Sequence, residues 1–74
     1  MDDKIKDIMA TVLEMDPSNI DENTSMQSVA VWDSLRHMNM IIAFEEQFNL
    51  EFEEEEIIDL MSYSALKKSI EEKL

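Results

Sequence analysis

The sequence predicts an all-α protein, a small four-helix bundle with a short third helix and a long loop between the first and second helices. Three observations predict this class. Apolar residues recur at three- and four-residue spacing in separate stretches, residues that begin or end helices flank those stretches, and turn residues gather in one long connection. A chain of 74 residues is expected to form a single domain, residues 1–74, around a small core.

The first predicted helix runs from about Asp2 to Met15. Its apolar residues follow the spacing of a helix that buries one face: Ile5, Ile8, Met9, Val12 and Leu13. The acidic pair at its start, Asp2 and Asp3, suits the positive end of the helix dipole. Pro17 is expected to end the helix, because the residue before a proline is driven out of the α region.

Residues 16–32 form a long connection that is rich in turn residues. Loops of this length in compact domains are usually functional or held in place by their own apolar side chains. Four residues are expected to hold it: Ile20, Met26, Val29 and Val31. Trp32, the only tryptophan, is expected to pack the loop against the base of the next helix, although direct contact with a partner is an alternative.

The central helix begins after Asp33, an N-cap residue whose carboxylate accepts from the free backbone N–H groups of the first turn. One apolar stripe follows from the helical period: His37, Met40, Ile41, Phe44 and Phe48. A second stripe, well separated around the axis, contains Leu35, Met38 and Ile42. A surface helix needs only one such stripe, so the second predicts either more core or another protein. Asn49 is expected to end this helix.

A short third helix is predicted over residues 53–60, with Ile57, Leu60 and Met61 on its buried side. Its glutamate run invites a calcium-loop reading, but the alternating ligands and central glycine of such loops are missing, which favours a solvated acidic face. Ser62 is a plausible N-cap for the last helix, residues 63–74. The side of that helix expected to face the core holds Tyr63, Leu66, Ile70 and Leu74.

The composition restricts the possible partners. The net charge is −12, from 18 acidic and 6 basic residues, so nucleic acid is not an expected ligand. A basic protein partner is the natural inference, with simple solubility as the alternative. There is no cysteine, no stretch long enough to span a membrane and no apolar run behind Met1. We therefore expect a monomer in the cytoplasm that uses no metal.

Asp33, Ser34 and His37 invite a hydrolase interpretation. Such an enzyme needs a base within reach of the serine, a group that orients the base and an oxyanion hole. Asp33 is expected to serve as the helix cap, and no glycine-flanked turn surrounds Ser34. A bundle of this size also offers little concave surface for a substrate, so the sequence argues against catalysis.

The junction resembles that of the acyl carrier proteins. Asp33-Ser34-Leu35 stands where the loop meets the helix, which ends Phe44-Glu45-Glu46-Gln47-Phe48. Trp32 before the triplet and His37-Met38-Asn39 after it are similar to stand-alone, specialised carriers. The resemblance implies a bundle of the acyl-carrier type that is not an enzyme. It also implies that Ser34 carries 4′-phosphopantetheine, which a separate phosphopantetheinyl transferase adds from coenzyme A.

A carrier serine needs an exposed hydroxyl and a favourable place for the arm's phosphate. The start of a helix supplies backbone N–H groups and a positive dipole end, with Asp33 as the cap. Arg36 is expected to add a cation near that phosphate. The alternative, that Ser34 is only a second cap beside Asp33, is the default for an isolated Asp-Ser pair.

The resemblance also implies a recognition surface, because the cargo is held as a thioester and is handled by separate enzymes. The expected partners are the transferase and acyl- or aminoacyl-loading and transfer enzymes. The second stripe is the expected docking patch, since exposed apolar patches commonly mark such sites. With its polar neighbours, the surface comprises Leu35, Met38, Asn39, Ile42 and Glu46.

The sequence departs from the carriers of fatty-acid synthesis at three places. Arg36 and His37 stand where those carriers usually have an acidic residue, and Trp32 replaces a small one. His37 lies on the inner stripe, where those carriers would line a chamber for the acyl chain; we expect it to be a hydrogen-bonded structural residue. These departures favour an amino acid, a short acyl group or a secondary metabolite as cargo. An unmodified acidic interaction module is the alternative function.

Overall fold

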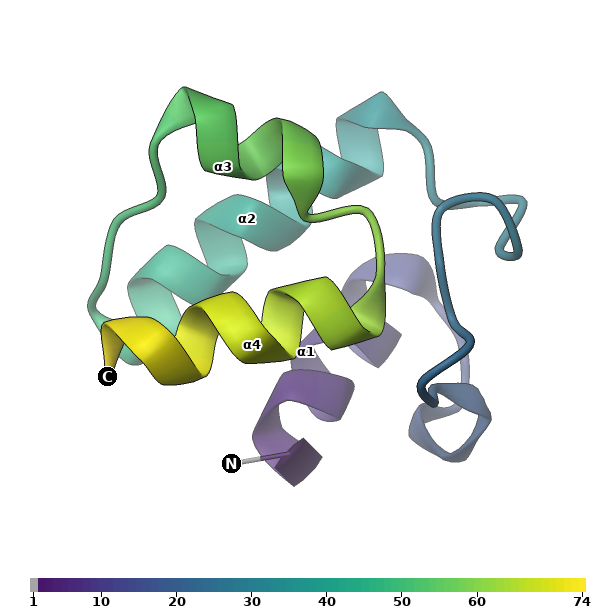
Figure 1. Cartoon of the computed structure of the whole chain (residues 1–74). Helices are drawn as coiled ribbons and strands as arrows, with labels where there is room; N and C mark the ends of the chain where they lie inside the picture. Colours follow the sequence, from purple (N-terminus) through teal and green to yellow (C-terminus); the bar gives the residue numbers. More distant parts are fainter. Residues whose placement is uncertain (1) are drawn as a thin grey trace.

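The computed structural model describes residues 2–74, with side chains from Asp3 onward, and confirms the all-α class. Its four α-helices are α1 (Asp2–Leu13), α2 (Ser34–Phe48), α3 (Glu54–Asp59) and α4 (Tyr63–Lys73). A short 3-10 helix, η1 (Pro17–Asn19), lies within the long connection. Figure 1 shows α2 and α3 along the top of the molecule, α4 below them and α1 behind.

α1 ends two residues earlier than the sequence predicts, and Pro17 does not end it. The last helical residue is Leu13, and Glu14 follows in the left-handed conformation with φ 55°. The N–H of Met15 then donates to the carbonyl of Ala10 at 3.0 Å, which is the closing bond of a Schellman motif. The backbone has therefore already turned before Pro17, which instead begins η1.

The connection between α1 and α2 is fixed mainly by backbone bonds to the segment between α3 and α4. The N–H of Met26 donates to Met61 O, and the N–H of Tyr63 donates to Thr24 O, both at 2.9 Å. Three of the four expected apolar anchors do face the core: Ile20, Met26 and Val29. Val31 does not face the core, contrary to the prediction. It is 46 % exposed, because the chain turns at residues 30–31 and buries the neighbouring indole instead.

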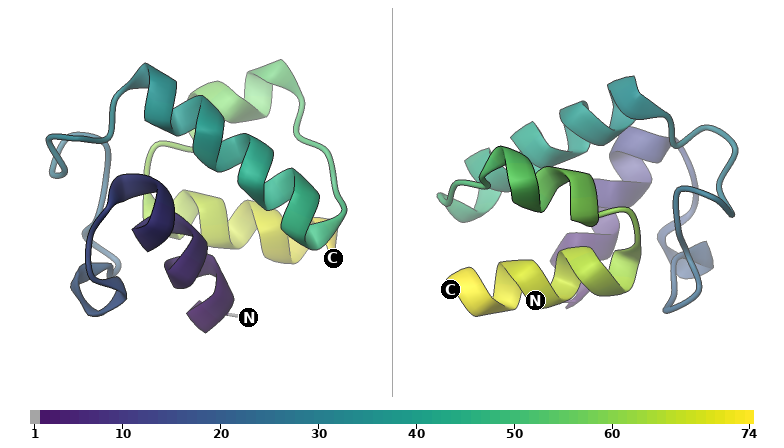
Figure 2. Two further views of the ribbon diagram at one scale, coloured as in Figure 1. Left: turned by 180° about the vertical axis from the view of Figure 1, so that it is seen from behind. Right: turned by 45° about the horizontal axis from the view of Figure 1, so that its top comes forward.

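One hydrophobic core lies between α1, α2 and α4. Seen from behind in the left view of Figure 2, α1 lies below α2, and α4 lies behind both. The side chains that these three helices bury completely or nearly so come from the predicted stripes: Ile5, Met9 and Leu13 of α1, Met40, Ile41 and Phe44 of α2, and Leu66 and Ile70 of α4. Helical periodicity therefore identified the buried face of each of these three helices.

Two residues assigned to the core by the sequence are exposed. Met61 is 44 % exposed, whereas its neighbour Leu60 is buried. Both residues lie in the non-helical segment between α3 and α4, where the helical spacing that predicted a buried Met61 does not apply. Leu74 is exposed because it lies after the end of α4 at Lys73 and beyond Ile70, the last buried residue of that helix.

Two predicted helix ends, Asn49 and Ser62, are confirmed, and α3 and α4 differ from the predicted ranges 53–60 and 63–74 by at most one residue at each end. Asn49 ends α2 in the left-handed conformation, with φ 54° and ψ 54°. The hydroxyl of Ser62 caps α4 and accepts from the N–H of Ala65 at 3.1 Å. None of the helices over residues 2–74 combines the length and the apolar character needed to cross a bilayer.

Candidate functional site

The candidate site is the start of α2, which the loop presents at the surface. Asp33 is extended, with φ −106° and ψ −174°, and its Oδ1 accepts from the N–H of Arg36 at 2.9 Å, so the predicted N-cap is confirmed. Its carbonyl accepts the first helical bond, from the N–H of His37 at 2.8 Å. Ser34 is the first helical residue and is exposed. Its hydroxyl therefore lies in solvent at the positive end of the α2 dipole.

Two of the first-turn donors remain available at this end of α2. The bonds to Asp33 occupy the N–H groups of Arg36 and His37. Over the part of the chain that the structure describes, the N–H groups of Ser34 and Leu35 have no protein acceptor. Free first-turn N–H groups are the feature that lets a helix start bind an anion.

The residue before Asp33 is anchored in the interior. Trp32 is 2 % exposed, as expected for a residue that packs the loop against α2. Its Nε1–H donates to Nδ1 of His37 at 3.1 Å, and the two ring centroids are 5.9 Å apart. The position of the loop immediately before Ser34 is thus set by a buried side-chain hydrogen bond to the helix that Ser34 begins.

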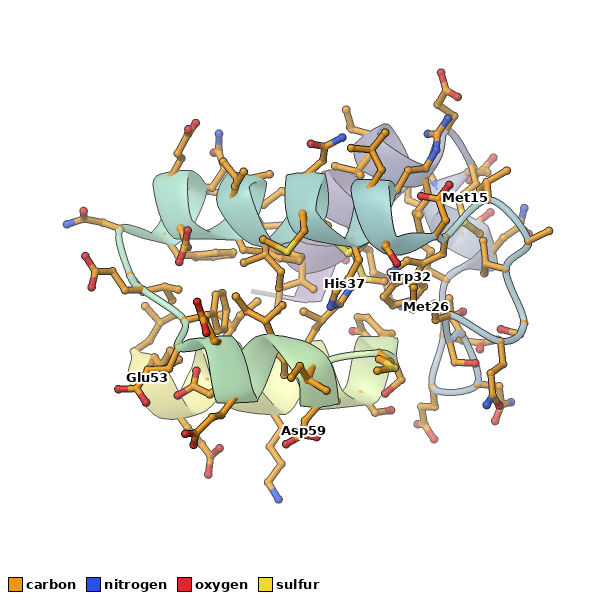
Figure 3. All side chains as sticks on the ribbon, turned by 90° about the horizontal axis from the view of Figure 1, so that it is seen from above. Met15, Met26, Trp32, His37, Glu53 and Asp59 are labelled. Atoms are coloured by element: carbon orange, nitrogen blue, oxygen red, sulfur yellow. The ribbon has the colours of Figure 1, made fainter. Side chains whose placement is uncertain are left out.

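His37 is itself buried, at 7 % exposure, and uses both ring nitrogens. The indole N–H of Trp32 can only donate, so Nδ1 of His37 must accept and the proton lies on Nε2. Nε2 then donates to the carbonyl of Ile57 in α3, 2.8 Å away. Figure 3 shows Trp32 and His37 between α2 and α3, at the end where the loop joins. The interpretation of His37 as a hydrogen-bonded structural residue is confirmed.

Arg36 connects the start of α2 to the end of α1. Its Nη1 donates to the carbonyl of Val12 at 2.6 Å, and its Nη2 pairs with Oε2 of Glu14 at 3.0 Å. Two residues along a helix are about 200° apart around the axis, so Arg36 and Ser34 leave α2 on different sides. In this structure the guanidinium is held by its contacts with Val12 and Glu14. Its expected place near a phosphate stays a prediction.

The second apolar stripe of α2 is exposed. Leu35 is 70 % exposed, and Met38 and Ile42 are also exposed, as are the two polar neighbours Asn39 and Glu46. Sequence reasoning missed three further apolar side chains that are exposed near this end of the molecule, Val31 before α2, Ile58 on α3 and Met61 after it. Val31 and Met61 lie outside the helices, where no helical spacing indicates which side chains are exposed.

A model of the phosphopantetheine attachment site family matches residues 3–70. The chain belongs to this family. It is therefore a carrier protein of the acyl carrier type, and its cofactor is covalently attached 4′-phosphopantetheine. Members of the family carry cargo without catalysing its chemistry, and they interact with phosphopantetheinyl transferases and biosynthetic enzymes.

The start of α2 fits what such a carrier needs. Attaching the arm requires an exposed hydroxyl, which Ser34 offers, and a favourable setting for one phosphodiester, which free N–H groups at a helix start offer. When attached, the arm supplies a terminal thiol that holds cargo as a thioester. The protein's own residues present the hydroxyl, cap the helix and fix the loop.

The geometry also weighs against a serine hydrolase in this carrier. A nucleophilic serine needs a base whose nitrogen is free to take its proton. His37 has the right spacing from Ser34, but Trp32 occupies one ring nitrogen and Ile57 the other. The carboxylate of Asp33 caps α2 instead of orienting the imidazole.

Proposed function

We propose that Ser34 is the attachment residue and that the chain presents an acyl or aminoacyl group, as a thioester on the arm, to its partner enzymes. The observation that supports this most directly is the exposed hydroxyl of Ser34 at the capped start of α2. Asp33 holds the first turn in place, and the two free N–H groups beside it favour a phosphate. Arg36 would neutralise part of that charge if its guanidinium turned from Glu14 to the arm.

Mass spectrometry tests the attachment site directly. The purified protein is incubated with coenzyme A, magnesium and a promiscuous phosphopantetheinyl transferase, and one arm should be added. Ser34→Ala should remain folded and take up none. Ser64→Ala removes another exposed serine near a helix start and should be modified like the wild type. Labelling of Ser34→Ala at a different serine would contradict the assignment.

We further propose that the outer stripe of α2 is the surface that partner enzymes contact. Leu35, Met38 and Ile42 are exposed apolar side chains on the helix that begins with Ser34, so a partner that reaches the arm also meets this stripe. Asn39 and Glu46 lie beside it and add polar contacts.

The double variant Leu35→Ala/Met38→Ala should slow transfer of cargo to the arm by the protein's own loading enzyme and should leave the fold intact. Leu74→Ala is the matched control, because it removes an exposed leucine beyond the end of α4. Equal loading rates for the wild type and the double variant would show that partner enzymes recognise a different surface.

The pattern of Trp32, Arg36 and His37 favours a short acyl or aminoacyl cargo over a long fatty acid.

A further inference from the structure

We propose that the hydrogen-bonded chain Trp32–His37–Ile57 closes the space between α2 and α3 beside Ser34, so that cargo on the arm stays outside the core. The inference rests on the proposed attachment at Ser34. It assigns this carrier to acyl groups that gain little from burial, either short or polar, including aminoacyl groups.

The first step concerns position. His37 follows Ser34 by one turn of α2 and therefore lies close to the same side of the helix. Its imidazole reaches across to the carbonyl of Ile57 at 2.8 Å, which bridges α2 and α3. In the view from above, Trp32 and His37 lie between these two helices, at the end where Ser34 begins α2. A hydrocarbon moving inward from Ser34 between α2 and α3 would meet these two rings first.

The second step concerns the space itself. The rings of Trp32 and His37 are buried, with centroids 5.9 Å apart, and the α2 side chains beyond them, Met40, Ile41 and Phe44, are also buried. An inserted chain would have to displace one of the rings. That would leave the indole N–H and the Nδ1 acceptor without a partner in a buried site, or the Ile57 carbonyl without one in a partly buried site, which is unfavourable. If apolar side chains stood in place of Trp32 and His37, an inserted chain would break no hydrogen bonds.

The third step concerns α3, which would have to move away from α2 to make room. Its last turn is held by the bond from His37 to Ile57. Glu56, on the preceding position, pairs with Nζ of Lys73 through both carboxylate oxygens, at 2.9 and 2.8 Å. α3 is therefore tied to both α2 and α4, and separating it breaks polar contacts on two sides.

The length of the cargo determines how much free energy would be gained by burying it in the core. The favourable free energy of burying an alkyl chain grows with each methylene group. A two-carbon acyl group gains almost nothing from entering the core, whereas an eight-carbon group gains enough to reveal any accessible space. Comparing the two on one arm therefore isolates the effect of burial.

The experiment loads the protein with acetyl- and octanoyl-phosphopantetheine from the two acyl-coenzyme A thioesters, using a promiscuous transferase. Mass spectrometry first shows whether each arm is attached at Ser34; failure at this stage contradicts the attachment proposal alone. Amide correlation spectra and melting temperatures are then compared. We expect the Trp32 indole resonance, the Ile57 amide resonance and the melting temperature to be the same in both forms.

An octanoyl form with a shifted Trp32 indole resonance and a higher melting temperature than the acetyl form would overturn the inference. His37→Ala removes the bridging ring, and in this variant the octanoyl arm should raise the melting temperature above that of the acetyl form. Equal melting temperatures in a folded His37→Ala protein would show that His37 is not what excludes the chain. If this variant does not fold, the wild-type comparison still decides.

Discussion

The residue with the most structural consequence here is His37, which the sequence places on an apolar stripe. Its two nitrogens are used in opposite senses, one accepting from Trp32 and the other donating to Ile57. One imidazole therefore joins the loop, α2 and α3, three segments whose relative positions set the surroundings of Ser34. A leucine at position 37 would fill part of the volume, but it would leave the indole N–H and the carbonyl unpaired.

At this scale we predict that Trp32→Phe destabilises the protein although it keeps an aromatic ring. The substitution leaves Nδ1 of His37 without its donor in a buried site, which should lower the free energy of unfolding by about 1–3 kcal/mol. Urea unfolding at neutral pH measures the change. The matched test repeats the substitution in a His37→Leu background, where no Nδ1 acceptor remains.

In that background Trp32→Phe should have a smaller effect, or should even stabilise, because it removes an indole N–H that has already lost its partner. Equal effects in the two backgrounds would mean that the loss reflects ring volume alone. The same substitution is made in both backgrounds, so the difference between its two effects reports the hydrogen bond between Trp32 and His37.

At the scale of elements, the ends of the helices position the site more than their lengths do. α1 ends at Glu14 with φ 55° and α2 at Asn49 with φ 54°, and neither residue is glycine. Asparagine tolerates this conformation comparatively well, but glutamate does not. Glu14 also pairs with Arg36, and the Val12 carbonyl that Arg36 contacts belongs to the same last turn. The end of α1 and the start of α2 are therefore fixed to each other.

We predict that Glu14→Gly is more stable than Glu14→Ala by about 1 kcal/mol, because only alanine retains a Cβ at positive φ. Both variants lose the pair with Arg36, which contributes little since the Glu14 side chain is 75 % exposed. Thermal unfolding of the two variants, measured side by side, therefore reports the energetic cost of the left-handed conformation at residue 14. Identical stability would show that residue 14 leaves the left-handed region when glutamate is replaced.

At the scale of the whole molecule, electrostatic repulsion opposes the fold. The net charge is −12. Residues 45–59 carry eight acidic side chains and no basic one: Glu45, Glu46, Glu51, Glu53, Glu54, Glu55, Glu56 and Asp59. Several lysines instead lie over aromatic rings of another segment. Nζ of Lys4 is 5.3 Å from the Phe48 ring centroid, and Nζ of Lys73 is 5.4 Å from that of Phe52. The few cations thus hold helices together and leave most of the acidic surface unneutralised.

We predict that sodium chloride and millimolar divalent cations both raise the melting temperature. Salt near 0.1 M reduces the screening length to about 10 Å, which weakens repulsion across the acidic segment. A differential scan over increasing salt measures the effect. In the triple variant Glu53→Gln/Glu54→Gln/Glu55→Gln, the dependence on salt should be smaller, since three exposed charges are gone. A wild-type melting temperature that does not change with salt would show that this repulsion is minor.

The sequence alone determined the features that depend on the backbone within one helix. The caps at Asp33 and Ser62, the left-handed end at Asn49 and the two stripes of α2 all follow from local hydrogen bonding and the 3.6-residue period. The exposed position of Ser34 follows in the same way, because a residue at the start of a capped helix projects beyond the core-facing stripe.

Only the tertiary structure decided which distant groups meet. Arg36 bonds to Val12, 24 residues away, and His37 bonds to Ile57, 20 residues away, and neither partner has a signature in the spacing of residues. The exposure of Val31 and Met61 likewise depends on the path of the chain between helices, at the turn of residues 30–31 and in the segment after α3. Such contacts depend on the packing of helices around a shared core, which is a property of the whole chain. Local periodicity fixes which face of a helix turns inward, but the packing selects the atoms it touches there.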